Sequence, residues 1–441
     1  MATIELARLR AWTAVPTPRF VGGNRVELLE GGSELFPRMR AAIAAAVREV
    51  WLATYIFHDD AAAIEVLDAL SAAAARGVAV HVVVDGFGSN GTLPAIRRRL
   101  AGTGVQLEVF RPLERWWAWL QPGQLRRLHQ KLCVCDSGGS NGSNGSNENG
   151  DSEEGGAVAF VGGINVIDDK LDLRHGWTEL PRLDFRRRGA RPLATAVHAT
   201  ARDVGARAPG ARLGRGRRTL ARSAALVAKA RRLVRQLRGA AVLDAADDPS
   251  PMRAAFLVRD NLRQRRTIER SYVEAIRSAR TRVDLAVPYF YPGRVFRRAL
   301  RNAARRGVRV RLLLQGKVDY RIAAIAARVL YDEMHANGIR IYEYTPAFLH
   351  AKVAVVDEEW ATVGSSNIDP LSLLLNLEAN VVVRDAEFAR SLAARFEAAF
   401  AASTEISAAP ARAGWRRWLR RAGVAWAANL YLRVAGITGR Y

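Results

Sequence analysis

Two histidines in this chain share one pattern of neighbours: a lysine follows two residues later and an aspartate seven residues later. The two sets are His129, Lys131 and Asp136 in LHQKLCVCD (128–136), and His350, Lys352 and Asp357 in FLHAKVAVVD (348–357). Both segments have the composition of a buried strand, in which residues two apart point to the same face. Each segment therefore presents an imidazole and an ammonium group together, which suits chemistry on an anion.

Each segment is followed by a glycine-containing turn that ends in asparagine, and then by a strand that carries one acid. The turns are FVGGIN (160–165) and TVGSSN (362–367), and the acids are Asp184 and Glu378. The turns are expected to donate hydrogen bonds to the oxygens of an anion, through Gly163, Asn165, Gly364, Ser365 and Asn367. The first turn has Gly-Gly-Ile-Asn where the second has Gly-Ser-Ser-Asn, so one hydroxyl is missing from it.

These groups fit the chemistry of a phosphodiester, which is an anion at neutral pH and repels nucleophiles. Lys131 and Lys352 can neutralise it as compact charges without a metal ion. Two facing imidazoles can divide the work, one attacking phosphorus and the other protonating the departing alkoxide. Each imidazole then requires a carboxylate on its other nitrogen to hold its tautomer and orientation. Asp136 and Asp357 complete the candidate catalytic set, and we expect them to shape the strand ends.

Cys133 and Cys135 raise the alternative of a metal or redox site inside the first motif. They are the only cysteines of the chain, and a zinc or redox role would require further Cys or His ligands. The second motif carries Ala354 and Val356 at the equivalent positions. Exchange with small apolar residues indicates that the cysteines pack in a core. We therefore expect no metal and no other cofactor.

The segments around the motifs alternate between helix and strand. Helices are expected at 38–50 and 61–77 and strands at 51–57 and 78–85, and the same order returns at 270–280, 281–291, 295–307 and 308–316. Arg76-Gly77-Val78 and Arg306-Gly307-Val308, 230 residues apart, each open a hydrophobic strand. A repeat unit of this size indicates a duplicated domain. The expected fold class is α/β, with two tandem, pseudo-two-fold related domains. Each is a mixed, largely parallel sheet flanked by helices, and the active site lies at their interface.

Composition divides the chain into four parts. A first domain is expected at 20–200, a basic linker or helical segment at 201–250, a second domain at 251–405, and a basic tail at 406–441. Residues 137–156, rich in Gly, Ser, Asn and Glu, are predicted to be a flexible insertion in the first motif. In the tail, Trp and Arg recur at helical spacing, which favours an anionic membrane surface over packing on the protein's own core.

The bulk composition points to a basic, soluble or peripheral protein. The 441 residues include 67 Lys and Arg against 43 Asp and Glu, a net charge of +24, which favours either nucleic acid or an anionic membrane as partner. The N-terminus lacks an apolar run long enough for a signal peptide or a membrane span, and so does the rest of the chain. Two cysteines are too few for a disulfide framework, which favours a reducing compartment.

The two motifs with their turns resemble the signature of the phospholipase D superfamily, from about Gly22 to about Phe400. Four stretches are similar to bacterial cardiolipin synthases that lack N-terminal membrane spans: GGNRVELLEGGSELFPRM (22–39), YIFHDD (55–60), VPYFYPGRVFRRALRNAARRGVRVRLLLQG (287–316) and WATVGSSNIDPLSLLLNLEANVVV (360–383). The resemblance implies tandem phospholipase D-like domains. It also implies transfer of a phosphatidyl group from one phosphatidylglycerol to the hydroxyl of another, with release of glycerol.

The resemblance further implies a role for each motif residue. His129 would be the nucleophile that forms a phosphohistidine, and His350 the general acid and later the base. Asp184 would pair with His129, and Glu378 with His350. Phosphatidylglycerol and a membrane surface are the implied partners, with no nucleic acid, and the implied location is peripheral on the cytoplasmic side of the inner membrane. One chain carries both half-sites, so catalysis does not require a dimer.

Other functions stay open on the residues alone. A phospholipase D would use the same groups with water as acceptor and yield phosphatidic acid. A nuclease of the same superfamily would also explain the net charge of +24, although the Trp-rich tail argues against it. A non-catalytic binder of anionic lipids is the third alternative, and two intact His/Lys pairs argue against that one.

Overall fold

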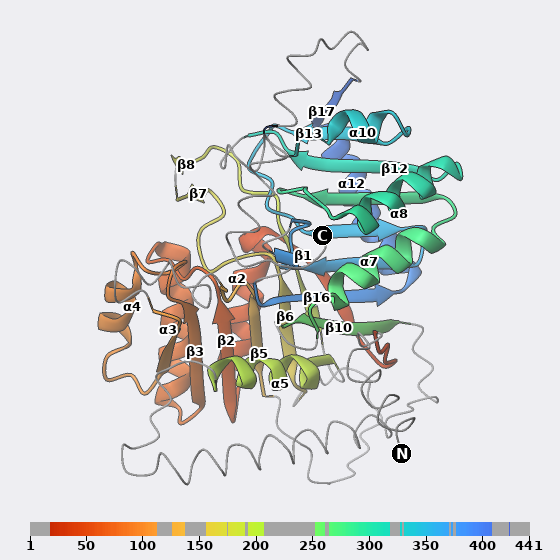
Figure 1. Cartoon of the computed structure of the whole chain (residues 1–441). Helices are drawn as coiled ribbons and strands as arrows, with labels where there is room; N and C mark the ends of the chain where they lie inside the picture. Colours follow the sequence, from red (N-terminus) through yellow and green to blue (C-terminus); the bar gives the residue numbers. More distant parts are fainter. Residues whose placement is uncertain are drawn as a thin grey trace, which may run out of the picture.

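The computed structural model describes residues 18–112, 126–136, 156–173, 175–189, 193–206, 252–260, 264–317, 327–328, 330–369, 372–373, 376–407 and 423. The predicted insertion at 137–156, basic segment at 201–250 and tail at 406–441 lie almost entirely outside them. The described residues form two large sheets, each with its own helices (Figure 1). Within this part of the chain, no helix is both long and apolar enough to cross a membrane.

The first sheet has the strand order β1-β9-β6-β5-β2-β3-β4. Its strands are β1 (Val26–Glu30), β2 (Glu49–Thr54), β3 (Ala79–Asp85), β4 (Gln106–Phe110), β5 (Leu132–Cys135), β6 (Val158–Gly162) and β9 (Phe185–Gly189). Its helices are α2 (Gly31–Ala44), α3 (Ala61–Ala75), α4 (Leu93–Leu100) and α5 (Leu193–Gly205). A separate hairpin consists of β7 (Leu171–Asp172) and β8 (Gly176–Trp177).

The second sheet has the order β10-β16-β15-β14-β11-β12-β13-β17. Its strands are β10 (Arg253–Arg259), β11 (Arg282–Val287), β12 (Arg309–Gln315), β13 (Arg340–Tyr344), β14 (Val353–Val356), β15 (Trp360–Gly364), β16 (Glu378–Arg384) and β17 (Ser403–Ile406). Its helices are α7 (Thr267–Ser278), α8 (Arg294–Arg305), α10 (Tyr331–His335) and α12 (Ala386–Ala401). The matching strand orders confirm the predicted duplication.

Both sheets are mixed, as predicted, and their parallel part coincides with the βα segments that suggested it. In the first sheet β2-β3-β4 are parallel, and in the second β11-β12-β13. Each motif strand pairs antiparallel with the strand that follows it, β5 with β6 and β14 with β15. Among the described strands, antiparallel pairs outnumber parallel pairs. Gly77 and Gly307 follow α3 and α8 with φ of 88° and 89°, a backbone conformation that ends helices and favours glycine.

The largest difference from a predicted boundary lies at the start of the first helix. Helix α2 begins at Gly31 rather than at residue 38 and ends at Ala44, although it contains two glycines and Pro37. These are poor helix formers, so local propensity does not explain the early start. A residue distant in sequence does: the carboxylate of Asp169 accepts the backbone N–H of Gly32 and so satisfies a donor at the helix N-terminus.

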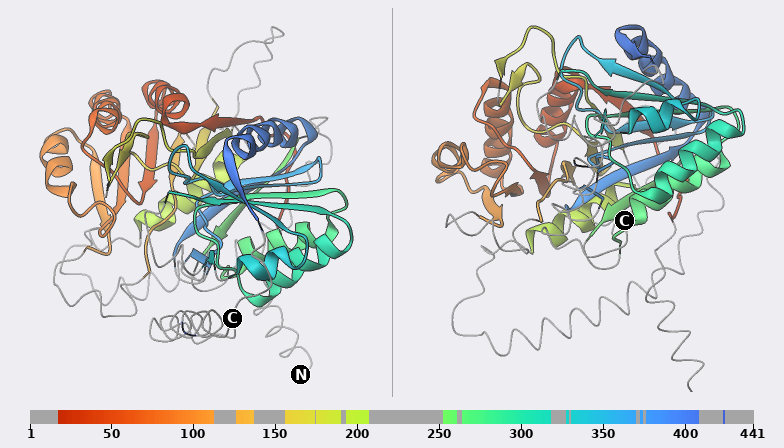
Figure 2. Two further views of the ribbon diagram at one scale, coloured as in Figure 1. Left: turned by 90° about the horizontal axis from the view of Figure 1, so that it is seen from above. Right: turned by 45° about the horizontal axis from the view of Figure 1, so that its top comes forward.

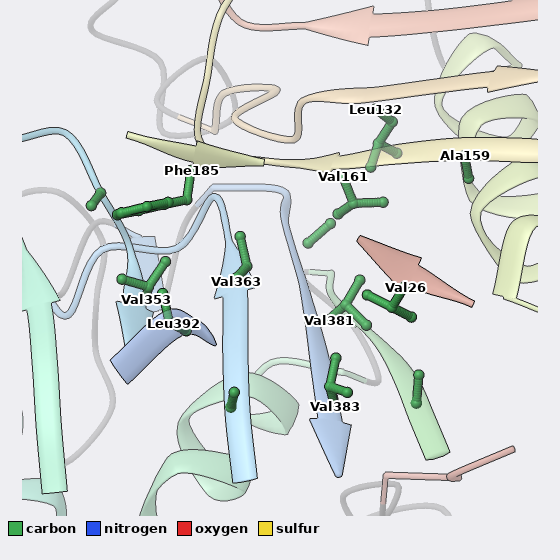
Figure 3. Close-up of a cluster of buried hydrophobic side chains, with 14 of the residues drawn as sticks. Val26, Leu132, Ala159, Val161, Phe185, Val353, Val363, Val381, Val383 and Leu392 are labelled. Carbon is green, nitrogen blue, oxygen red and sulfur yellow. The ribbon is translucent and has the colours of Figure 1, made fainter. Parts of the chain in front are cut away.

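The two domains share one of three apolar cores. Outer cores lie between each sheet and its own helices, with α2 and α3 on the first sheet and α7 and α8 on the second (Figure 2). The third core lies between the sheets and receives side chains from both (Figure 3), among them Leu132, Val161, Val353, Val363 and Val381. Across this core, β6 contacts β15 and β16, and β9 contacts β15.

The two cysteines lie in the outer core of the first domain. Cys133 pairs with Leu52 on β2 and Phe160 on β6. The exposed fractions of Cys133 and Cys135 are 0% and 3%. This position agrees with the interpretation of both as small apolar residues. Among the described residues, no three His, Cys, Asp or Glu side chains are grouped in a way that could hold a metal ion.

The motif aspartates tie strand ends together in the same way in both domains. Asp136 and Asp357 have φ of 49° and 52°, a conformation that Asp tolerates better than most residues. The Asp136 carboxylate accepts the N–H groups of Val47 and Arg48 at 2.8 Å. That of Asp357 accepts the N–H groups of Thr281 at 2.8 Å and Arg280 at 3.0 Å. Each aspartate stands seven residues beyond its histidine, about 23 Å along an extended chain, so it shapes the strand end.

We predict that Asp357→Ala lowers the free energy of unfolding by roughly 1–3 kcal/mol, because several N–H groups lose their acceptor. Asp357→Asn should cost less, since Asn keeps one acceptor and tolerates positive φ. Burial alone would raise the pKa of Asp357, but hydrogen bonds from Thr281 and Arg282 hold it below its usual range. Its stabilising effect is therefore present above pH 4 and lost as the pH falls through the lowered pKa.

Urea unfolding of the wild type and both variants at neutral pH and near pH 2 measures this effect. The difference between wild type and variants should shrink at the lower pH. Asp136→Asn serves as the matched variant in the first domain. An unchanged unfolding midpoint in Asp357→Ala would contradict the structural role.

Candidate active site

The residue before each histidine pairs with the residue before the other domain's acid. The two parallel bridges are Leu128 with Leu377 and Leu183 with Leu349. The N–H of His129 donates to the carbonyl of Leu377 at 3.0 Å, and the N–H of His350 donates to the carbonyl of Leu183 at 2.9 Å. The backbone just before each motif strand is thus paired with backbone of the other domain.

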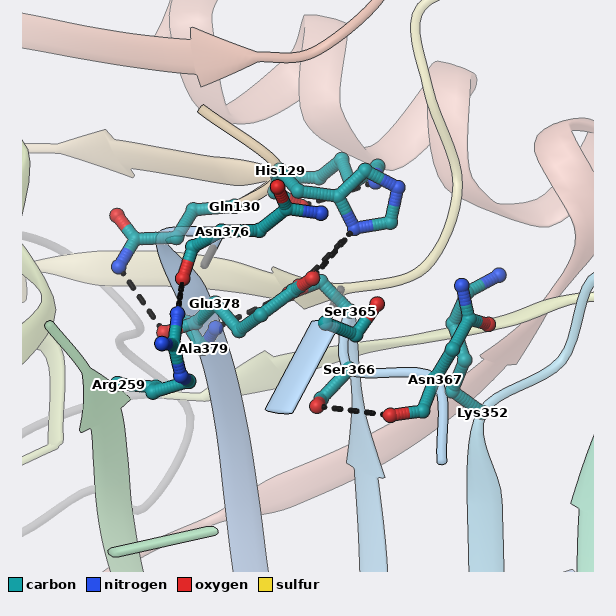
Figure 4. Close-up of polar contacts among 12 residues, drawn as sticks. His129, Gln130, Arg259, Lys352, Ser365, Ser366, Asn367, Asn376, Glu378 and Ala379 are labelled. Atoms are coloured by element: carbon teal, nitrogen blue, oxygen red, sulfur yellow. Dashed lines mark hydrogen bonds and ion pairs between the residues drawn. The ribbon is translucent and has the colours of Figure 1, made fainter. Parts of the chain in front are cut away.

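As a result of these bridges, each histidine is paired with a carboxylate of the other domain. His129 Nδ1 lies 3.0 Å from Glu378 Oε2 (Figure 4), and His350 Nδ1 lies 2.6 Å from Asp184 Oδ2. The prediction that Asp184 pairs with His129 and Glu378 with His350 is therefore wrong. Sequence order suggested pairing within each domain, whereas the inter-sheet packing places each acid against the other domain's histidine.

Both imidazoles favour the neutral form in this site. Burial lowers the pKa of His129, although the charge of Glu378 opposes the change. Burial, followed by the charges of Lys352 and Arg182, places the pKa of His350 well below its ordinary value. Burial also raises the pKa of Asp184 to about 6. With Nδ1 of each ring directed at a carboxylate, Nε2 is the nitrogen left for chemistry.

The two motif lysines are fully buried beside the histidines. The exposed fraction of both Lys131 and Lys352 is 0%. Lys131 Nζ donates to the carbonyl of His129 at 2.9 Å, and Lys352 Nζ donates to the carbonyl of His350. Burial lowers the pKa of Lys131 to about 7, against the opposing charge of Glu378. An anion bound next to Lys131 would favour its charged form and so raise its pKa again.

The turn residues Ser365 and Gly163 lie against the two site carboxylates, Glu378 and Asp184. The hydroxyl of Ser365 donates to Glu378 Oε2 at 2.5 Å and accepts the N–H of Ala379 at 3.0 Å. Its single proton is directed at Glu378, which corrects the expectation that Ser365 donates to phosphate. At the equivalent position in the first turn, a Cβ on Gly163 would overlap the carboxylate of Asp184. Asp184 therefore occupies space that a side chain would take.

The other turn residues are also buried around the site. The amide oxygen of Asn165 accepts the N–H of Ile56 at 3.2 Å, so its NH₂ group is the donor that it can offer. The amide oxygen of Asn367 is a buried acceptor without a hydrogen-bond partner among the described residues. Gly364 allows close approach of β16, since a Cβ there would overlap the side chain of Asn380.

Sequence reasoning missed two further residues that position the histidines. The carboxylate of Asp85, at the end of β3, accepts the N–H of Leu128 at 2.8 Å. The amide oxygen of Gln315, at the end of β12, accepts the N–H of Leu349. Both residues are buried. They are 230 residues apart, the same offset as the Arg-Gly-Val repeat, and that offset is the signal that could have found them.

We predict that Asp85→Leu lowers kcat for a soluble phosphodiester roughly 100-fold, since misplacement of a reacting group by about 1 Å has an effect of that size. Asp85→Asn should stay within about threefold of the wild type, because its amide oxygen can accept the N–H of Leu128 as Gln315 does for Leu349. Separate measurement of kcat and KM tests this. A loss in Asp85→Asn equal to that in Asp85→Leu would show that the charge of Asp85 matters rather than its acceptor.

Comparison with known proteins gives matches over most of the chain. A family model described as cardiolipin synthase, PLD-like domain, matches residues 39–176 and 272–400. Cardiolipin synthase B of Escherichia coli (strain K12) is 33% identical over 370 residues, covering 84% of this chain and 79% of that protein. Cardiolipin synthase A of Pseudomonas putida is 29% identical over 407 residues, covering 92% and 74%.

A solved structure shares the fold over nearly the whole chain. The crystal structure of phosphatidylserine synthase from Haemophilus influenzae Rd KW20 covers 97% of this chain and 98% of its own, with a TM-score of 0.62 and 13% identity. The fold class predicted from the sequence, two tandem domains of the phospholipase D type, is confirmed. The chain belongs to the cardiolipin synthase family of phospholipase D-like proteins.

Proposed function

We propose that this protein is a phosphatidyltransferase that converts two molecules of phosphatidylglycerol into cardiolipin and glycerol. The observation that carries the proposal is the pair of buried histidines, each held at Nδ1 by a carboxylate of the other domain. With Lys131 and Lys352 beside them, these groups can bind one phosphodiester and exchange the alcohol on its phosphorus. Membership of the cardiolipin synthase family supports the choice of lipid.

In the first half-reaction, Nε2 of neutral His129 attacks the phosphorus of the donor lipid. A bond forms between nitrogen and phosphorus, and the bond from phosphorus to the headgroup oxygen breaks. His350 takes up a proton when the anionic phosphodiester binds, gives that proton to the headgroup oxygen, and glycerol leaves. The phosphatidyl group then stays on His129, whose Nδ1 proton lies against the Glu378 carboxylate. The now neutral His350 is ready to act as a base.

In the second half-reaction, the terminal hydroxyl of a second phosphatidylglycerol replaces glycerol. His350 Nε2 takes the hydroxyl proton, and the oxygen attacks phosphorus. The bond to His129 breaks, cardiolipin leaves, and His350 is protonated again. Water in place of the lipid hydroxyl would give phosphatidic acid, so the acceptor alone separates a synthase from a phospholipase D.

Lys131 and Lys352 offset the charge of the phosphodiester, and Asn165 and Asn367 are the side-chain donors proposed for its oxygens. Hydrogen bonds to developing negative charge are strongest in such a water-poor site. Ser365 takes a different part, since its hydroxyl holds Glu378. Asp85 and Gln315 hold the backbone that precedes each histidine.

We further propose that the protein works as a peripheral protein at the cytoplasmic surface of the inner membrane. Its substrate is an anionic lipid, and the net charge of +24 favours an anionic surface. The Trp- and Arg-rich tail at 406–441, predicted to contact the membrane, lies almost wholly outside the described residues.

Expression in a bacterial host without cardiolipin synthases should restore cardiolipin, as measured by lipid mass spectrometry. His129→Ala and His350→Ala should each lower its formation by roughly a thousandfold, because nucleophile and acid are lost. His335→Ala, on α10 at a distance from both motifs, is the matched histidine control. With purified protein and phosphatidylglycerol, glycerol should be released in step with cardiolipin.

Two results would contradict this function. Phosphatidic acid as the main product, even with excess phosphatidylglycerol, would indicate a hydrolase. If the protein restored growth of the host without making cardiolipin, and the variant with both His129→Ala and His350→Ala did the same, the protein would be a non-catalytic lipid binder.

A second prediction concerns the charge of Lys131. Sulfate, which stays a dianion from pH 6.5 to 8.5, should inhibit turnover of a soluble phosphodiester competitively. Its inhibition constant should rise roughly tenfold over this range, because the ammonium of Lys131, with a pKa of about 7, loses its proton as the pH rises. Burial lowers the pKa of both histidines, which moves their titration away from the upper part of this range. In Lys131→Met, sulfate should bind weakly at every pH. A wild-type inhibition constant independent of pH would contradict the role of Lys131 as the titrating phosphate ligand.

A further inference from the structure

The hairpin β7–β8 carries a group of exposed apolar side chains. Within the described residues, the exposed large apolar side chains are Val47, Phe87, Leu173, Trp177, Leu180 and Val295. Three of them fall on or just after the hairpin: Leu173 is 54% exposed, Trp177 66% and Leu180 51%. Figure 1 shows the hairpin standing apart from both sheets. Such a cluster on a projecting element marks an interaction surface.

The base of the hairpin is held firmly although its tip is exposed. Arg182 donates from its guanidinium to the carbonyl of Leu171 at 2.7 Å, and its N–H donates to the carbonyl of Asp169 at 2.9 Å. The N–H of Thr178 donates to the carbonyl of Lys170 at 2.7 Å. The carboxylate of Asp169 also accepts the N–H of Gly32 at the start of α2. The apolar tip is therefore presented by a structured element.

The hairpin adjoins the catalytic residues at both of its ends. It follows the turn that contains Asn165 and leads directly into Leu183 and Asp184. The ring of His175 lies 5.1 Å from the ring of Phe348, two residues before His350. The charge of Arg182 acts on His350 and helps to lower its pKa. Whatever the tip contacts is thus brought next to the site.

The chemistry of the tip indicates its partner. Residues 170–182 include Lys170, Arg174 and Arg182 against Asp172 and Glu179, a formal charge of only +1. Because this charge is small, the exposed apolar side chains are the main feature that the tip offers to a partner. An indole among leucines suits the layer between lipid headgroups and acyl chains, where Trp is enriched. The lipid that must reach His129 and His350 comes from that layer.

We propose that the hairpin inserts Leu173, Trp177 and Leu180 into the interfacial layer of a phospholipid bilayer and so presents the active site to lipid in the membrane. This inference rests on the proposed function, because it assumes a lipid substrate. It goes beyond the predicted basic tail, since it places an apolar contact beside the site itself.

The test uses the full chain and a variant with Leu173→Ser, Trp177→Ser and Leu180→Ser together. Co-sedimentation with vesicles of phosphatidylglycerol and phosphatidylethanolamine should show roughly tenfold weaker binding of the variant, given the apolar area lost. The difference should persist at high salt, which screens contacts of basic segments but not apolar insertion. Val47→Ser, which alters an exposed apolar residue beside Asp136, is the matched control and should bind as the wild type does.

An environment-sensitive dye on Leu180→Cys tests insertion directly. Cys133 and Cys135 are 0% and 3% exposed, so the dye should react at position 180 only. Its emission should shift to the blue when vesicles are added, and dye on Val47→Cys should show no shift. Equal vesicle affinity of the triple variant, or no shift at position 180 while the protein binds vesicles, would overturn the proposal. Concentration-dependent dimerisation of the wild type that the triple variant loses would assign the tip to a second copy and overturn it too.

Failure of this inference can be told apart from failure of the proposed function. With a short-chain phosphatidylglycerol held below its micelle concentration, the triple variant should turn over lipid at the wild-type rate. With vesicles it should be slower by about the loss in binding. A wild type that makes no cardiolipin from either substrate would refute the proposed function, whereas equal rates of variant and wild type on vesicles would refute the inference alone.

Discussion

The active site depends on the crossing of backbone between the two domains. Leu128 pairs with Leu377 and Leu183 with Leu349, and each bridge places a histidine opposite an acid from the other half of the chain. Neither domain holds a complete pair by itself. The apolar core between the sheets is therefore part of the catalytic apparatus, because any shift of one sheet against the other would separate Nδ1 of both histidines from their carboxylates.

This arrangement buries an unusual number of ionisable groups. Lys131, Lys352, Asp184 and Glu378 have almost no exposed surface, and removing such groups from water is costly unless each finds a partner. The lysines find main-chain carbonyls of the histidines, and the acids find imidazoles. Even so, burial lowers the pKa of Lys131 to about 7 and raises that of Asp184 to about 6. A phosphodiester would bring a further negative charge next to both lysines, so substrate binding would offset part of the cost of burial.

The sequence predicted the features that recur in both halves of the chain. It did not predict the contacts that depend on how the two sheets pack against each other. The HxK pairs, the duplication and the core position of Cys133 and Cys135 could be read from two aligned motifs. The partners of Asp184 and Glu378 could not, because the alignment of the two halves says nothing of how their sheets meet. The same limit hid the contact of Asp169 with α2. Ser365 was assigned to phosphate because hydroxyls bind phosphate, but its geometry directs it to Glu378.

The two half-sites are unequal in a way that supports different roles for the histidines. Glu378 receives the hydroxyl of Ser365 and stands opposite Arg259 on the neighbouring strand, whereas Asp184 has Gly163 in place of the serine. A histidine that carries a phosphoryl group on Nε2 and a proton on Nδ1 is cationic, and a carboxylate that accepts the Nδ1 proton stabilises it. Glu378, held by the hydroxyl of Ser365, lies at Nδ1 of His129. His350, beside Lys352 and Arg182, is instead placed to lose its proton readily, as a general acid must.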